Sequence, residues 1–300
     1  MVRGRDLLSA AVPGVVILGA AFVWLLASLN RLPPVMGDLL GRGYPAILIM
    51  LGLMLLIGRR VRFGNALAVG LTGIFVVGVA VIAYNRQSGE FREDYSEPIA
   101  FTVLPEIRTI TATVTMGRTE ITIKPAPAGD RRITGIFTGS LESLVTADFQ
   151  VSGTTATFTL IERSRSAVPL LDQVGRGRLT LFLPEGTTFE TLTVIGTDGD
   201  IGFEGETLAF RGVSLRTGQG SIKATFPALP GVIGDLIAPR GAVQITIPST
   251  IAAQIALRGG GASTPHFPNE RYTLRIDNVL VPKTDAQMQV TIEGSAIVIQ

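Results

Sequence analysis

The 300-residue chain contains no cysteine, one histidine and few charged residues, and each shortage argues against a class of function. Without cysteine there is neither a disulfide framework nor thiol chemistry. The single histidine, His266, cannot form a metal cluster by itself. It lies in a proline-flanked loop, and no Gly-x-Ser-x-Gly turn stands near it to carry a catalytic serine. We therefore expect a protein that is not an enzyme and that holds no cofactor or metal.

The scarcity of charge is uneven along the chain. The charged fraction of 17% is below the roughly 25% of soluble domains, as expected when part of a chain lies in lipid. Residues 1–85 carry seven arginines against two aspartates, whereas residues 86–300 carry 19 basic and 22 acidic side chains. The basic balance therefore belongs to the N-terminal part alone. A nucleic-acid partner is not expected for the rest of the chain.

Three apolar runs, at residues 7–29, 44–58 and 63–84, predict a transmembrane helical module over residues 1–85. The first and third are long enough, as helices, to cross the ~30 Å hydrocarbon core of a lipid bilayer. The middle run is short, and a re-entrant hairpin is the alternative to a full crossing. A cleaved signal peptide is the alternative for the first run, although that run is longer than the apolar core of such signals. We expect three uncleaved spans.

The arginines that flank these runs predict the orientation of the chain in a cell membrane. The cytoplasmic side of a membrane protein is the side richer in Lys and Arg. With three spans, we expect a cytoplasmic N-terminus and an extracytoplasmic C-terminal domain. If the middle run does not cross, the domain lies in the cytoplasm instead. One side carries Arg3, Arg5, Arg59, Arg60 and Arg62, and the other carries Arg31, Arg42, Arg86 and Arg92.

After a polar stretch at residues 86–106, which we interpret as a linker, the pattern changes to strands. Apolar residues alternate with threonine from Ile107 onward, and a period of two is typical of a β-strand. One unit then recurs every 21 residues, with an apolar residue seven positions before the end of each unit. The units are Asp198-Gly199-Asp200-Ile201, Gln219-Gly220-Ser221-Ile222 and Arg240-Gly241-Ala242-Val243, and the upstream residues are Val194, Leu215 and Leu236.

Each unit reads as a strand, a corner that contains glycine, and a second strand. One such rung cannot bury its apolar row alone, but stacked rungs share a continuous core. The constant spacing predicts an all-β domain over residues 107–300, a β-solenoid or β-roll with rungs of about 21 residues. An antiparallel sandwich with glycine turns is the alternative. Diverged units are expected at Met116–Pro125 and Leu179–Pro184, and a last one at Gly294–Ile299.

The unit Thr197–Phe203, repeated after short strands, resembles the bacterial adhesin-type "toastrack" β-solenoid families. Membrane spans followed by such a domain are also similar to LiaF-like cell-wall-stress membrane proteins. The resemblance covers residues 107–300 and implies a surface or envelope role in signalling or adhesion, with no catalytic residues to carry over. The number of spans and the length of the solenoid depart from the LiaF-like pattern.

Two features suggest ligands at first sight. Asp198 and Asp200 resemble a calcium-binding turn, because hard cations prefer clustered carboxylates. A calcium roll would repeat these ligands, yet the next rung has Gln219 and Ser221 at the same positions. The glycine-rich turns lack the Gly-Lys-Ser/Thr ending and the strand-to-helix context of a phosphate-binding loop. We interpret all of them as ordinary corners.

Four arginines form the one candidate contact site. They frame a loop that contains Pro169, with Glu162 and Asp172 as the only acidic residues among them. Such a set is suited to anionic lipid headgroups or wall polymers, and a solvated insertion is the alternative. The four are Arg163, Arg165, Arg176 and Arg178.

Together these features predict a non-enzymatic membrane protein of the cell envelope. In the leading interpretation its extracytoplasmic solenoid binds a partner protein or cell-wall component and acts as a sensor or regulator of the envelope. The alternative is a structural or adhesive surface module that acts by self-association, because the ends of a solenoid are exposed strand edges. The sequence leaves the ligand and the oligomeric state open.

Overall fold

The computed structural model describes residues 88–165, 175–258 and 265–300. The three predicted spans lie outside these residues. Within them, no helix has the length and apolar character needed to cross a bilayer. The chain divides into two compact units, and nearly all described residues belong to the unit formed by Glu90–Pro169 and Gly175–Gln300. Only this unit is described below.

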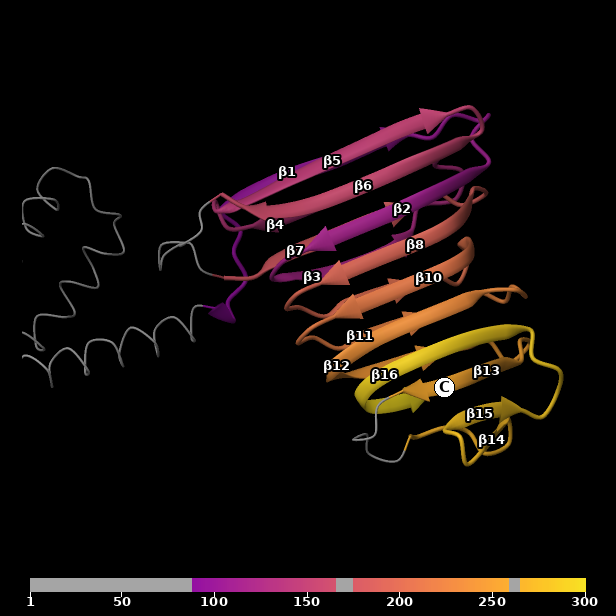
Figure 1. Cartoon of the computed structure of the whole chain (residues 1–300). Helices are drawn as coiled ribbons and strands as arrows, with labels where there is room; N and C mark the ends of the chain where they lie inside the picture. Colours follow the sequence, from indigo (N-terminus) through magenta and orange to yellow (C-terminus); the bar gives the residue numbers. More distant parts are fainter. Residues whose placement is uncertain (1–87, 166–174, 259–264) are drawn as a thin grey trace, which may run out of the picture. The chain divides into compact units, whose positions relative to one another are not determined.

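The described part of the chain is all β (Figure 1). Its strands are β1 (Tyr95–Thr102), β2 (Thr109–Met116), β3 (Thr119–Pro125), β4 (Arg132–Gly139), β5 (Ser143–Ser152), β6 (Thr155–Ser164), β7 (Gly177–Leu183), β8 (Thr188–Gly196), β9 (Ile201–Glu204), β10 (Ala209–Thr217), β11 (Ile222–Thr225), β12 (Ile233–Thr246), β13 (Ala253–Arg258), β14 (Tyr272–Leu274), β15 (Val279–Pro282) and β16 (Met288–Ile299).

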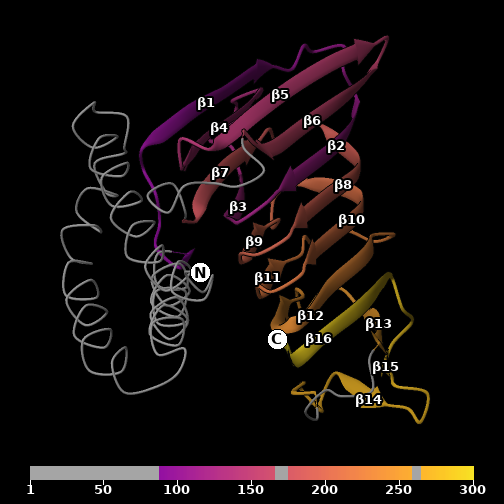
Figure 2. The ribbon, with the colours of Figure 1, turned by 60° about the vertical axis from the view of Figure 1, so that its left-hand side comes forward.

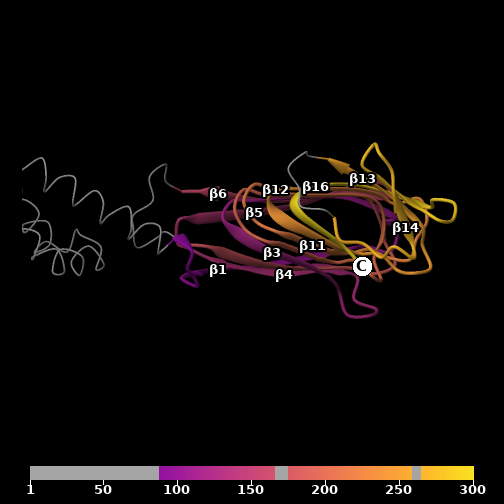
Figure 3. The same ribbon diagram turned by 90° about the horizontal axis from the view of Figure 1, so that it is seen from below.

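These strands form one hydrogen-bonded sheet that folds over itself into two layers (Figures 2 and 3). Layer A runs in the order β5-β6-β2-β8-β10-β12-β16-β13, and layer B in the order β1-β4-β7-β3-β9-β11-β12-β16. The long strands β12 and β16 occur in both layers because they continue through the corner. Each coil therefore contributes one strand to each layer, which is the architecture of a flattened solenoid.

The 21-residue register expected from the sequence is confirmed. In layer A, Leu215 pairs with Val194 on one side and with Leu236 on the other, both through parallel ladders. In layer B, Ile222 likewise pairs with Ile201 and Val243. The corners between these positions are therefore stacked one above another. The last coil is two residues shorter at its corner, since Ala238 pairs with Gly294 and Ala242 with Ala296.

Polar hydrogen bonds run along the stacked corners. The Ser221 backbone N–H donates to the Asp200 carboxylate at 2.7 Å, and the Ala242 N–H donates to the Ser221 hydroxyl at 3.2 Å. Each of these side chains thus accepts a hydrogen bond from a backbone N–H of the next coil. Without this acceptor, the N–H group at the corner would need a water molecule as its partner. Asp200 serves as a structural acceptor at this corner.

The core lies between the two layers. Alternate residues of each strand are buried, as in the pattern of β7, where Leu179, Leu181 and Leu183 are all fully enclosed. A row of aromatic rings crosses the coils, with centroids of Phe210 5.4 Å from Phe203 and 6.2 Å from Phe226. Burying one such side chain contributes about 1.5–3 kcal/mol, so the stacked rows supply the main driving force for folding.

The order of the coils in space differs from their order in the chain. The coil β6–β7 stacks on one side of the coil β2–β3, and β8–β9 stacks on the other side. The first coil of the chain is therefore an inner coil. The expected units at Met116–Pro125 and Leu179–Pro184 do end in the layer B strands β3 and β7, which are neighbours. Their paired residues are 58 apart in the chain rather than 21, since Thr119 pairs with Gly177.

The end of the solenoid nearest the start of the domain is closed by antiparallel strands. In layer B, β4 pairs with β7, and β1 pairs with β4. In layer A, β5 pairs with β6. The structure differs here from the expected linker at residues 86–106, because Tyr95–Thr102 forms β1. Ile99 on β1 is only 3% exposed, and Tyr95 and Phe101 of the same strand also pack against the core.

The opposite end carries a small hairpin. Strand β13 lies beside β16, β15 pairs with β13, and the three-residue β14 completes layer A. In layer B the outer edge of β16 is covered by His266, whose backbone N–H donates to Ile297 and whose carbonyl accepts from Ile299. The single histidine thus has a structural backbone role.

Candidate functional site

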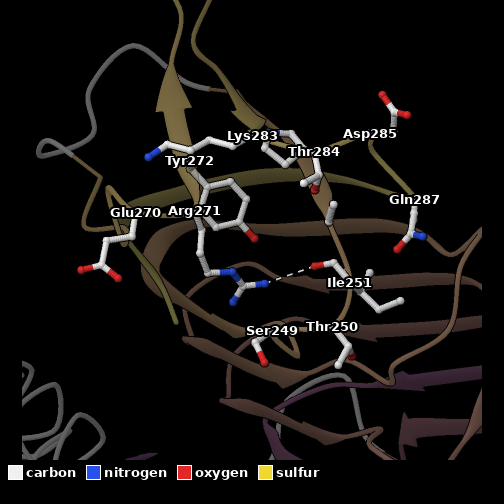
Figure 4. A pocket seen from close by; sticks show the side chains of 12 residues that line it. Ser249, Thr250, Ile251, Glu270, Arg271, Tyr272, Lys283, Thr284, Asp285 and Gln287 are labelled. Atoms are coloured by element: carbon white, nitrogen blue, oxygen red, sulfur yellow. Dashed lines mark hydrogen bonds between the residues drawn. The ribbon is translucent and has the colours of Figure 1, made fainter.

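A cavity of about 570 Å³ lies at the hairpin end of the domain (Figure 4). Hydroxyl, amide, carboxylate and ammonium groups surround its rim, and most of these side chains are exposed. The lining consists of Ser249, Thr250, Ile251, Ala252, Glu270, Arg271, Tyr272, Pro282, Lys283, Thr284, Asp285 and Gln287.

Arg271 holds the hairpin to the body of the domain. Its guanidinium donates hydrogen bonds to the carbonyls of Ile247, Pro248 and Ile251 at 3.0, 3.0 and 3.1 Å. These three carbonyls lie in the turn that follows β12, outside the strand ladders, so the Arg271 side chain supplies their hydrogen-bond donors. Arg271 is therefore occupied by a structural task and is not a free cation in the cavity.

Tyr272 is the one deeply buried polar residue of the cavity. Its side chain is 2% exposed, and among the described residues its hydroxyl has no hydrogen-bond partner. In Figure 4 the hydroxyl points toward the Ser249–Ile251 segment. Burial raises the pKa of Tyr272 above its usual value of 10.0, so the phenol stays neutral over the physiological range. A neutral phenol enclosed in this way is a poor acid or base.

The acidic side chains of the cavity lie at its exposed rim. Glu270 and Asp285 are exposed and have no histidine or hydroxyl beside them in a hydrogen-bonded relay. Over residues 88–165, 175–258 and 265–300, no three His, Asp or Glu side chains converge to hold a metal ion. A polar rim of this kind is able to hydrogen-bond water or a polar ligand.

The four candidate arginines do not act as one set. Arg176 and Arg178 have acidic partners, since Arg176 lies 3.2 Å from Asp198 and Arg178 lies 3.7 Å from Glu120. Arg178 also stacks over the exposed ring of Phe91 at 4.4 Å. These contacts reduce the positive charge that either side chain offers to an anionic surface.

The other two arginines are more open. Arg163 and Arg165 are exposed near the end of β6, and Arg165 lies 5.5 Å from the centre of the Tyr95 ring. The sequence suggested Glu162 and Asp172 as the acidic residues opposing these arginines. Asp172 lies outside the described residues, and the Glu162 carboxylate accepts its hydrogen bonds from residues other than these arginines.

Glu162 is instead a structural acceptor. Its carboxylate accepts from the Gly117 N–H at 2.8 Å and from the Thr119 and Ser143 hydroxyls at 2.7 Å each. Thr119 is fully buried, so this carboxylate joins the β2–β3 corner to the start of β5. These three hydrogen bonds give Glu162 a structural role at this corner.

Asp198 has the same character. It is paired with Arg118 at 3.5 Å and with Arg176 at 3.2 Å, and its side chain is 17% exposed. Asp200, the other carboxylate of this turn, accepts from Ser221. Both groups that resembled calcium ligands in the sequence therefore have protein partners in the structure.

The sequence reading did not single out the edge strand β5. It is the last strand of layer A and pairs only with β6 in the described part of the chain. Two of its apolar side chains are exposed, Leu144 by 42% and Val151 by 48%. The run Ser143–Ser152 combines β-forming residues with a single charge, Asp148, and this composition is the signal that would have identified it.

The chain was also compared with known proteins. No protein-family model matches it, and no curated protein sequence matches it significantly. Its structure is similar to that of a candidate cell adhesion protein from Clostridium sporogenes ATCC 15579, with a TM-score of 0.56 and 14% identity over 68% of this chain and 99% of that one. A candidate adhesin from Bacteroides fragilis NCTC 9343 aligns over 69% of this chain and 97% of that one at 10% identity, but with a TM-score of only 0.21. The first likeness shows a shared fold.

Proposed function

We propose that this chain is a non-enzymatic adhesive module of the cell envelope. The observation that carries the proposal is the exposed edge of β5, a ten-residue strand that ends layer A with apolar side chains in solvent. Such an edge is a ready template for pairing with another chain. The shared fold with a candidate cell adhesion protein supports the same class of role.

The distribution of polar groups favours binding over reaction. Two partly buried carboxylates of the domain already have protein partners. Glu162 accepts from a backbone N–H and two hydroxyls, and Asp198 is paired with two arginines. The cavity at the hairpin offers hydroxyls and an exposed rim. Adhesion requires surfaces of this kind and no activated nucleophile.

The proposal includes a location. Residues 1–85 would anchor the chain through three spans, with the β domain on the outer side of the membrane. The exposed residue Thr273 on β14 provides a test, because the chain has no native cysteine. We expect a Thr273→Cys variant to react with a membrane-impermeant maleimide in intact cells. Reaction only after lysis would place the domain inside and remove the basis for adhesion.

Adhesion itself is tested by mixing fluorescent cells that display the chain with cells that do not. We expect the displaying cells to form clumps. We also expect purified full-length protein in detergent to self-associate as its concentration rises. If the protein stays monomeric, binds no surface and hydrolyses a glycan, the proposal is refuted. If deletion changes transcription of envelope genes while adhesion is absent, the sensor interpretation is favoured instead.

A further inference from the structure

We propose that β5 binds β5 of a second copy of this chain, antiparallel and in a register centred on Ala147. The pairing would join two solenoids end to end and extend layer A across both. This inference rests on the adhesive function proposed above and identifies the surface and the partner. Two observations support it: the other edges of the described sheet are blocked, and the sequence of β5 has no feature that prevents pairing.

The other edges of the described sheet are protected against such pairing. Strand β1, the edge of layer B, contains Pro98, which has no N–H to donate. At the far end, β14 is only three residues long, and short edges resist pairing. There too, the backbone of His266 covers the edge of β16.

Strand β5 has none of these protective features. It has no proline, lysine or glycine over its ten residues, and its one charge is Asp148. Val145 is buried and Ala147 and Phe149 are partly buried against the core, with the Phe149 ring 5.7 Å from Phe101. The strand is therefore held firmly on its inner face, while no strand of the described residues pairs with its outer edge, so it is ordered in advance for pairing.

The alternation of β5 limits which registers a second copy can adopt. A two-fold axis perpendicular to the sheet keeps both inner faces on the core side when it lies midway between the two copies of one residue of the strand. Centring on Ala147 pairs Val145 with Phe149 on the inner face and Thr146 with Asp148 on the outer face. Centring on Asp148 gives a similar overlap but places two carboxylates opposite each other, which is unfavourable.

One strand pair is a small interface, well below the roughly 1,000 Å² typical of stable complexes. Each contact is therefore weak, and a surface carrying many copies would bind through their combined effect. The contact is also isologous, so it closes at two copies and does not lead to fibres. Both properties suit reversible attachment between surfaces.

Cysteine cross-linking of the full-length protein tests the register, because any introduced thiol is the only one in the chain. Thr146→Cys and Asp148→Cys variants, each exposed and with a different affinity tag, are mixed in detergent and oxidised. Directly opposite residues have Cα atoms about 4.5–5.5 Å apart, within disulfide range, whereas residues two positions out of register are about 7–8 Å apart. We expect the mixed dimer to exceed either homodimer by roughly fivefold or more. Predominance of the Asp148→Cys homodimer, or no cross-link, would overturn the register or the pairing.

A charge at the edge provides the second test. Val151→Lys places an ammonium at the C-terminal end of the strand. Ile195→Lys, on the interior strand β8, is the matched control, since Ile195 is 39% exposed and Val151 48%. We expect Val151→Lys to weaken self-association of the full chain about tenfold or more and Ile195→Lys to leave it unchanged. Adhesion that survives Val151→Lys would refute the β5 interface and leave the adhesive function standing. A wild-type protein that does not adhere would refute the function itself.

Discussion

Gly220 is the position where a single methyl group should do most damage to the solenoid. It lies in the corner between β10 and β11, directly above the corresponding corner of the preceding coil. A Cβ atom added here would lie 1.8 Å from the Gly199 carbonyl oxygen and 2.8 Å from the Asp200 nitrogen. Both obstacles are backbone, so no side chain can rotate away. We expect Gly220→Ala to be strongly destabilising.

The magnitude follows from the bonds that a displaced corner would lose. Ordinary contact begins near 3.4 Å, so the coils must separate by well over 1 Å at this point. That movement breaks the buried hydrogen bond from the Thr217 hydroxyl to the Gly199 carbonyl at 2.8 Å. It also breaks the bond from the Ser221 N–H to Asp200 at 2.7 Å. Two lost bonds and one buried group left without a partner cost about 3 kcal/mol.

Chemical and thermal unfolding of residues 88–300, followed by far-ultraviolet circular dichroism, measures this loss. At about 2–4 °C per kcal/mol for a domain of this size, the melting temperature should fall by roughly 6–12 °C. Gly202→Ala, on β9 of the neighbouring coil, is the control, since its nearest neighbour would be 3.8 Å away. We expect a change of less than about 1 kcal/mol there. Equal stabilities of the two variants would show that the corners are not stacked as described.

Three further substitutions test individual polar groups. Glu162→Gln should destabilise the domain by about 1.5–3 kcal/mol in urea unfolding, because one of the oxygens that accept three hydrogen bonds becomes a donor, whereas Glu206→Gln at an exposed turn should change little. Tyr272→Phe should leave stability unchanged or raise it by about 1 kcal/mol, since it removes a buried hydroxyl without a described partner. Because the pKa of Tyr272 is raised, the wild type should lose stability as the pH rises above 10.0, and the phenylalanine variant should lose less. Arg132→Gln should raise the pKa of Asp130 toward its usual value, measured by NMR titration, because the Arg132 hydrogen bond lowers it.

The repeated part of the fold could be predicted because its physics is local. Residues 21 apart meet in adjacent coils, so the spacing of Val194, Leu215 and Leu236 in the sequence is also their spacing in the sheet. The alternation of buried and exposed residues then fixes which face is inside. The three membrane spans are equally local predictions, but they lie outside the described residues and stay predictions.

The order of the coils could not be read in the same way. Strand β2 pairs with β6 at an offset of 46 residues and with β8 at an offset of about 80. The offset of 80 recurs between β3 and β9 of the same two coils, but β3 pairs with β7 at an offset of 58. The order of these coils therefore has no constant spacing comparable to the 21-residue repeat. The cost of closing such long loops grows slowly with length, and the stacked core therefore tolerates them.

The arginine site shows why a cluster in sequence is a weak guide to a charged surface. Arg176 and Arg178 are close to Arg163 and Arg165 in the chain, but each is paired with an acid that arrives from a different coil. Asp198 follows β8 and Glu120 lies on β3. These partners become neighbours only through the crossover of coils, which the sequence does not reveal. The same crossover brings Glu162 to the β2–β3 corner and away from the arginines.

The crossover also explains why the open edge is where it is. A solenoid that simply wound forward from β2 would leave the parallel coil β2–β3 as its first edge. Here the coil β6–β7 lies outside that coil, β4 and β5 pair antiparallel with β7 and β6, and β1 lies outside β4. These antiparallel strands end the stack of parallel coils, and β1, which contains Pro98, is the edge of layer B. Layer A is left with β5, whose inner face is packed and whose outer edge is open, and this combination is what a reversible strand-to-strand contact requires.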